Sequence, residues 1–138
     1  MKYKPFLFII FILVCTNAFS QKTILDSIQI KYVNPQITSI IDVTCDEFEK
    51  AFAENLKICN IGSKQRLQNY ENVINNKYLL DKQTDIDVRY KIIFFGQNSK
   101  KACLIVCMDK FKKATINGEL IKDESFLTLL KESVLELK

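Results

Sequence analysis

Hydrophobic and polar residues alternate in two stretches near the start of the chain, and we expect both to form strands. Residues 24–32 place apolar side chains on one side, with Gln29 and Lys31 on the other. A period of two is typical of a half-buried strand. Pro35 interrupts the pattern, and residues 37–43 begin a second alternation. The two stretches therefore predict an antiparallel hairpin.

Helical spacing replaces this alternation in three later segments. Thr44 and Glu47 fit a capping box, whose side chains satisfy free backbone donors, and they predict a helix over residues 45–56. Ser63 is an acceptable N-cap for a second helix, and Asp123 can cap a third. The apolar stripe of the third helix consists of Phe126, Leu129, Leu130, Val134 and Leu137.

The strongest tertiary signal is a pair of apolar stretches, residues 86–95 and 102–108, separated by turn residues. They predict a central hairpin that is buried on at least one side. A tighter hairpin follows between residues 114–116 and 119–121. Its Asn117-Gly118 pair favours a type I′ turn, because both positions tolerate positive φ.

Strands thus cluster along the chain instead of alternating strictly with helices. The expected order is ββ-α-(β)-α-ββββ-α, in which the bracketed strand is the short, ambiguous segment 57–61. This order favours a single small α+β domain with a mainly antiparallel sheet and about three helices. Residues 77–85 are expected to form a longer loop, and no repeat or internal linker divides the chain.

The first 20 residues have the three parts of a signal peptide. Lys2 and Lys4 provide the positive region, an uncharged apolar run follows, and small residues precede a cut between Ser20 and Gln21. The apolar run is too short for a membrane anchor. Lipidation at Cys15 is disfavoured because a valine stands directly before it. We therefore expect residues 1–20 to be removed and residues 21–138 to act in a periplasm or outside the cell.

Removing this leader changes the charge of the chain. The protein has 20 Lys and Arg, two of them in the leader, and 16 Asp and Glu, all after it, which leaves a net charge of +2. A nearly neutral domain argues against a dedicated nucleic-acid binder, which usually carries a concentrated basic face. No later apolar segment is long enough to span a membrane.

Four cysteines follow the leader, and an even number in a small exported domain favours disulfides. Cys103 and Cys107 stand four apart on an expected strand, so their Cα atoms would lie roughly 13 Å apart, too far for a bridge. If two bridges form, Cys45 pairs with Cys103 and Cys59 with Cys107, or Cys45 pairs with Cys107 and Cys59 with Cys103. Buried free thiols and a zinc site made from all four are the alternatives.

The chain contains no histidine and only three glycines, which removes Ser-His-Asp and Cys-His catalysis and glycine-rich phosphate loops. Carboxylate chemistry remains possible, because Asp85, Asp87 and Arg89 would share one face at the start of a strand. The alternative is a solvated strand entrance with an ion pair worth less than about 1 kcal/mol.

Lysines flank the apolar stretch 102–108 on both sides. Those after it are Lys110, Lys112 and Lys113, beside Phe111. They could form a basic patch for an acidic partner or a membrane surface. They could equally be charges that prevent sheet edges from pairing between molecules.

These observations lead to an expected function without a named ligand. We expect a non-enzymatic, exported binding or interaction protein, possessing no cofactor or metal, whose partner is another exported protein or a surface component. An inhibitor or immunity-type protein is a natural subtype. A small hydrolase or lyase that uses Asp85, Asp87 and Arg89 is one alternative, and a structural assembly subunit is another. The oligomeric state stays open.

Overall fold

The computed structural model describes residues 22–76, 78–97 and 101–137. The predicted leader, its cut between Ser20 and Gln21, and Cys15 lie outside the described residues. The elements, in chain order, are β1 (Leu25–Tyr32), α2 (Phe48–Ala51), β2 (Lys57–Ile61), α3 (Lys64–Asn75), β3 (Leu80–Gln83), β4 (Val88–Gly96), β5 (Ala102–Asp109), β6 (Ala114–Ile116), β7 (Glu119–Ile121) and α4 (Glu124–Leu135).

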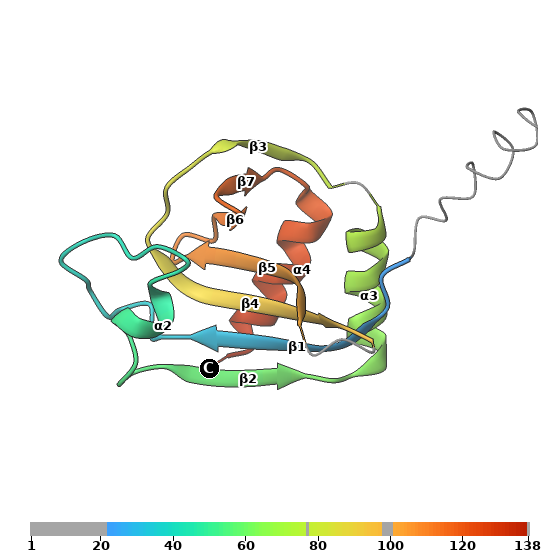
Figure 1. Cartoon of the computed structure of the whole chain (residues 1–138), viewed down its shortest axis with the longest axis horizontal. Helices are drawn as coiled ribbons and strands as arrows, with labels where there is room; N and C mark the ends of the chain where they lie inside the picture. Colours follow the sequence, from blue (N-terminus) through green and yellow to red (C-terminus); the bar gives the residue numbers. More distant parts are fainter. Residues whose placement is uncertain (1–21, 77, 98–100, 138) are drawn as a thin grey trace, which may run out of the picture.

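The strands form one antiparallel sheet of seven strands in the order β2-β1-β4-β5-β6-β7-β3 (Figure 1). Strand β4 is buried along most of its length and lies near the middle of the sheet, between β1 and β5. The α+β class, the antiparallel sheet and the central hairpin are thus confirmed. None of the helices in the described ranges is long and apolar enough to cross a membrane.

Helices α3 and α4 cover one face of the sheet, which we call the helix face (Figure 1). Phe126 and Leu130 of α4 are fully buried against Ile92 and Phe94 of β4 in the main hydrophobic core. Asp123 caps α4 as expected, since its carboxylate accepts a hydrogen bond of 2.8 Å from the Phe126 amide. The apolar stripe of α4 therefore fixes the helix on the sheet.

The opposite face, which we call the loop face, is covered in part by the segment between β1 and β2. This segment buries Val33, Val43, Phe48 and Phe52 in a second, smaller cluster with Val88 and Cys107 of the sheet. In Figure 1 its first part projects beyond the ends of the strands as a loop. The loop face thus combines a small apolar core with an exposed projection.

The expected strand over residues 37–43 is wrong: the structure has no strand there. Strand β1 is hydrogen-bonded to β2 on one side and to β4 on the other, so neither of its edges is open to a further partner. The alternation that suggested a hairpin therefore belongs to a loop.

Two further expectations need correction. The helix expected over residues 45–56 is shorter, because α2 occupies only Phe48–Ala51 and a turn at residues 52–55 redirects the chain into β2. The loop expected at residues 77–85 contains β3, which pairs with the otherwise open edge of β7. The four residues of β3 are all exposed, so no apolar pattern marks them.

The predicted turn at Asn117-Gly118 agrees better with the structure than these two segments do. Asn117 and Gly118 have φ values of 51° and 83°, as a type I′ hairpin turn requires. A Cβ at Gly118 would meet only the flexible end of the exposed Gln83 side chain, which can move aside, so the positive φ is the reason for glycine there. Ser63 directly precedes α3, but its side chain makes no capping hydrogen bond.

Candidate functional site: a clamped loop beside a groove

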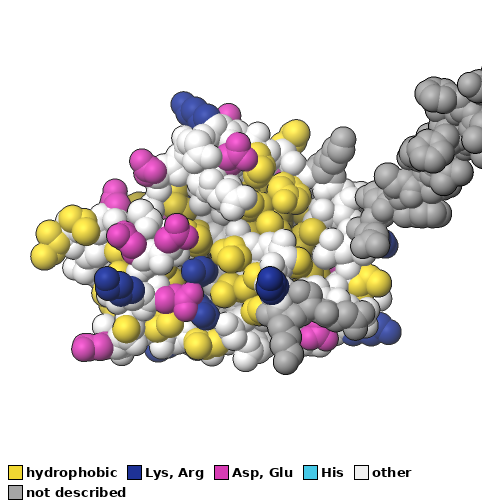
Figure 2. Space-filling model, in the orientation of Figure 1, with side chains coloured by type: hydrophobic (Ala, Val, Ile, Leu, Met, Phe, Trp, Pro, Cys, Tyr) yellow, Lys and Arg dark blue, Asp and Glu magenta, His cyan; other side chains and the backbone are white. Residues whose placement is uncertain are grey.

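Two adjacent and strongly exposed apolar side chains stand at the tip of the projecting loop. Ile40 is 104% exposed and Ile41 is 73% exposed. We call residues 34–42 the clamped loop, for the contacts described below. Figure 2 shows hydrophobic side chains at the tip of this projection, away from the body of the molecule.

Backbone hydrogen bonds attach both ends of the clamped loop to the start of β4. Before the loop, the Val33 amide donates to the Arg89 carbonyl at 3.1 Å. After it, the Val43 carbonyl accepts from the Val88 amide at 2.9 Å. The two ends are thus held on the same strand, and the tip projects between them.

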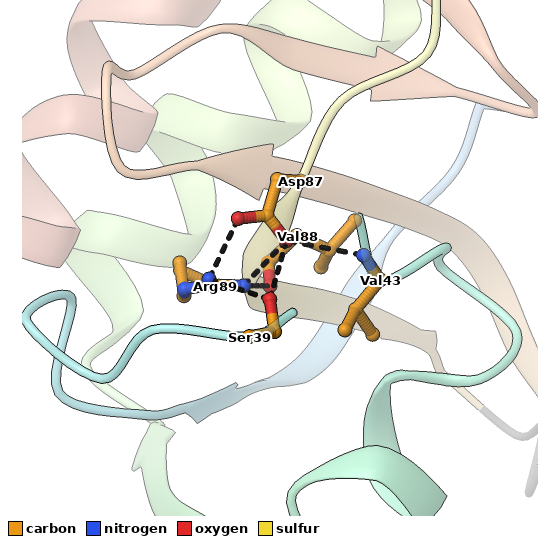
Figure 3. A network of polar contacts seen from close by, with 5 residues as sticks. All are labelled: Ser39, Val43, Asp87, Val88 and Arg89. Atoms are coloured by element: carbon orange, nitrogen blue, oxygen red, sulfur yellow. Dashed lines mark hydrogen bonds and ion pairs between the residues drawn. The ribbon is translucent and has the colours of Figure 1, made fainter. Parts of the chain in front are cut away.

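Side chains add a second attachment, shown in Figure 3. The guanidinium of Arg89 forms two contacts of 2.6 Å with the two oxygens of Asp87, in a bidentate pair. It also donates to the Ser39 hydroxyl at 3.1 Å, and the Val43 amide donates to Asp87 at 3.1 Å. The ion pair therefore holds residues 39 and 43, which flank the tip on its two sides.

Arg89 is far more buried than an ion pair at a strand entrance would be. It is 2% exposed, its guanidinium lies 5.1 Å from the centre of the Phe52 ring, and its Nε atom is buried without a hydrogen-bond partner. The expected solvated ion pair is therefore wrong for Arg89. Removing Arg89 would leave a partly buried carboxylate unpaired, which is strongly unfavourable.

A disulfide gives the loop face a covalent attachment. Cys45, just after the clamped loop, is bonded to the buried Cys107 of β5, with Cα atoms 5.8 Å apart. This is one of the pairings that the sequence left open. The second bridge of that scheme is not formed, since Cys59 and Cys103 are free thiols. Strands β1 and β4 separate β2 from β5, which puts these two strands roughly 14 Å apart.

An ion-pair network attaches α2 to the sheet. The Glu49 carboxylate contacts the Lys31 ammonium of β1 at 2.5 Å and the Lys91 ammonium of β4 at 3.0 Å. The hydrogen bonds from Lys31 and then Lys91 lower the pKa of Glu49 below its ordinary value. The single negative charge of Glu49 thus offsets part of the positive charge of two lysines on the loop side of the sheet.

A groove of about 660 Å³ lies between the end of the clamped loop, the residues before β4 and the β6–β7 turn. Its walls carry three exposed carboxylates, Asp42, Asp46 and Asp85. The lining residues are Asp42, Thr44, Cys45, Asp46, Thr84, Asp85, Ile86, Val88, Lys91, Ile105, Thr115, Asn117 and Gly118. In Figure 2 acidic side chains gather beside the projecting loop.

The three residues considered for carboxylate catalysis have different places. Asp85 lines the groove, whereas Asp87 and Arg89 do not. Both oxygens of Asp87 are engaged by Arg89, and one of them also accepts from the Val43 amide. In the part of the chain that the structure describes, no three His, Cys, Asp or Glu side chains are grouped so that they could hold a metal ion.

The lysines after β5 lie in the turn between β5 and β6. Phe111 is 74% exposed, and the Lys110 ammonium lies 5.0 Å from the centre of its ring. Lys112 instead folds back, with its ammonium 3.2 Å from the Tyr90 hydroxyl. Lys113 is exposed, and its amide donates to Asp109. These side chains thus make local contacts at one end of the sheet.

Sequence reasoning missed the clamped loop, because its residues were assigned to a strand. A signal was present: the alternation placed polar Ser39 among the inward positions and apolar Ile40 among the outward ones. Such a break indicates that the segment does not lie on a sheet. No protein-family model, no curated protein and no solved structure matches this chain.

Proposed function

We propose that this protein is a non-enzymatic, exported interaction protein that binds another exported protein through the clamped loop. The observation that carries the proposal is the combination of an exposed Ile40-Ile41 tip with attachments on both sides of it. No other part of the described structure buries these two isoleucines, and hydrogen bonds hold residues 39 and 43 on either side of them in place.

Attachment of the loop favours binding because it reduces the conformational entropy that the loop loses when it binds. A free loop must be ordered when it binds, and a loop held in advance avoids much of that cost. Burial of an isoleucine side chain contributes about 1.5–3 kcal/mol, so two adjacent ones can anchor a contact. A projecting apolar tip fits a concave apolar site, as an inhibitor or immunity-type protein would require.

The disulfide supports the exported part of the proposal. Disulfides persist in oxidising compartments and are rare in the cytosol, and the Cys45–Cys107 bridge is compatible with a periplasmic or extracellular location. The signal peptide predicted at residues 1–20 would direct the chain to such a compartment.

A capture experiment with matched variants tests the role of the tip. The protein, expressed as the full chain in an oxidising host compartment, would be immobilised and exposed to exported proteins of its own source. We expect Ile40→Ser/Ile41→Ser to weaken capture of a specific protein at least about 10-fold, because both apolar anchors are lost.

The control is Ile58→Ser, which removes an exposed isoleucine from the edge strand β2, outside the clamped loop. It should leave capture unchanged. Equal capture by the wild type and the Ile40→Ser/Ile41→Ser variant would show that the clamped loop is not the binding element. Capture lost equally with Ile58→Ser would point to the edge strand instead.

A further inference from the structure

The groove continues the surface that begins at the loop tip. Asp42, Thr44, Cys45 and Asp46 follow Ile41 directly in the chain and form one wall of the groove. A partner seated on the tip would therefore also face the groove. The disulfide at Cys45 fixes this wall against β5, so the tip and the groove keep one geometry.

The charge of the groove differs from that of the whole chain. Residues 21–138 have a net charge of +2, yet the groove carries the carboxylates of Asp42, Asp46 and Asp85. Lys91 is the cationic side chain in its lining, and Glu49 already pairs with that ammonium at 3.0 Å. The groove is therefore negative where the molecule as a whole is positive.

The groove also offers apolar surface between these charges. Ile86, Val88 and Ile105 belong to its lining, together with the disulfide at Cys45. An arginine or lysine side chain has an apolar stem and a charged end, so it can lie along such a surface and place its charge at the carboxylates. Charge and shape thus favour the same kind of group.

We propose that the partner presents a basic side chain, arginine or lysine, which enters this groove beside the apolar site that receives Ile40 and Ile41. This inference rests on the proposed function, because it names the chemistry of the protein that the clamped loop binds. Oppositely charged surfaces also speed association and select against wrong partners.

Selection from a displayed library of random peptides tests this inference without a known partner. The probe is the library, and the bait is the full-chain protein with its disulfide intact. We expect enriched peptides to carry arginine or lysine next to apolar residues. Their affinity should fall at least about 10-fold with Asp42→Asn/Asp46→Asn/Asp85→Asn, a variant in which three exposed carboxylates lose their charge.

A variant with the same change of net charge elsewhere is the control. Asp26→Asn/Glu54→Gln/Glu132→Gln removes three other exposed carboxylates and should leave peptide binding unchanged. Enriched peptides that lack basic residues, peptides that bind the groove variant equally well, or no enrichment at all would overturn the inference.

Two further results distinguish this inference from binding of small cations and from the proposed function of the loop tip. Displacement of the peptides by an equal concentration of spermidine would overturn the protein-partner inference and make the groove a site for small cations. Capture that depends on Ile40 and Ile41 but not on the three aspartates would refute the basic partner and leave the proposed function standing. The reverse result would refute the role of the loop tip.

Discussion

The two faces of the sheet are held together by different forces. On the helix face, α3 and α4 bury a large continuous core, in which Tyr70, Phe94 and Phe126 meet edge to face. On the loop face, a smaller cluster is supplemented by a disulfide, a buried ion pair and the Glu49 network. Both faces pack on the same strands, yet only the helix face relies mainly on apolar burial.

This difference follows from what each segment can bury. The helices present apolar side chains at helical spacing along their whole length, so burial is spread over many contacts. The segment between β1 and β2 has few apolar side chains that reach the sheet, and it is therefore attached at particular points. Point attachments hold a loop while its tip stays exposed, which suits a contact surface.

The largest expected effect is loss of the disulfide. Cys45→Ala/Cys107→Ala should lower the free energy of unfolding by about 4 kcal/mol, because the bridge joins residues 62 apart and restricts the unfolded chain. Urea denaturation measures this change. Cys103→Ala, which removes an exposed free thiol, should alter stability by less than about 0.5 kcal/mol. A double variant as stable as the wild type would refute the importance of the bridge.

The helix face should weaken at alkaline pH through Tyr70. Burial raises the pKa of Tyr70 to about 12, so the unfolded chain ionises first as the pH rises above 10. The contribution of neutral Tyr70 to stability is fully present below pH 10 and should fall by about 2 kcal/mol by pH 12.

The variant Tyr70→Phe isolates this effect. It cannot ionise, and at neutral pH it loses hydrogen bonds to the Leu129 carbonyl and to Ser133, worth about 1 kcal/mol each. Urea midpoints of both proteins from pH 8 to 12 give the comparison. Parallel pH profiles would show that Tyr70 does not control alkaline stability.

Loss of the buried cation should affect the loop face specifically. Arg89→Met keeps most of the volume but leaves Asp87 unpaired, and since Asp87 is 26% exposed we expect a loss of about 2 kcal/mol. Hydrogen exchange should speed up at the Val43 amide, while the amides of α4 keep their protection relative to global unfolding.

A second variant shows whether the unpaired charge is the cause. Arg89→Met/Asp87→Asn should recover at least half of the lost stability, because a neutral amide replaces the unpaired carboxylate. No recovery would mean that Arg89 acts through packing on Phe52 and not through its charge.

The smallest expected effect concerns Glu49. Its pKa is lowered in the folded protein, so its contribution is present above about pH 4.5 and is lost as the pH falls through the folded-state pKa. Because its side chain is 40% exposed, Glu49→Gln should lower stability by less than about 1 kcal/mol at pH 7.

Salt and acid provide the checks on Glu49. The difference between the wild type and Glu49→Gln should shrink in 1 M NaCl and vanish at pH 2. Glu54→Gln, an exposed carboxylate nearby in the chain, should show no such dependence. A difference that persists at pH 2 would exclude ionisation of Glu49 as its cause.

The accuracy of sequence-based expectation also differs between the two faces. Strands β4 and β5, the Asn117-Gly118 turn and the Asp123 cap were predicted because each depends on neighbours in the chain. Residues 37–43 were mistaken for a strand, because competition for the edges of β1 cannot be seen locally. Strand β3 was missed because its pairing depends on the open edge of β7, which no pattern within residues 80–83 indicates.

By itself the sequence determined the α+β class, the amphipathic helices, the central hairpin and the exclusion of Cys103–Cys107 as a pair. These follow from periodicity, from turn chemistry and from the rise of a strand, which act over a few residues. Only the tertiary structure decided that Cys45 bonds Cys107, that Arg89 is buried with Asp87, and that Ile40 and Ile41 are left exposed. The reason is that each depends on which distant segments pack together, and the order of strands in the sheet sets that packing.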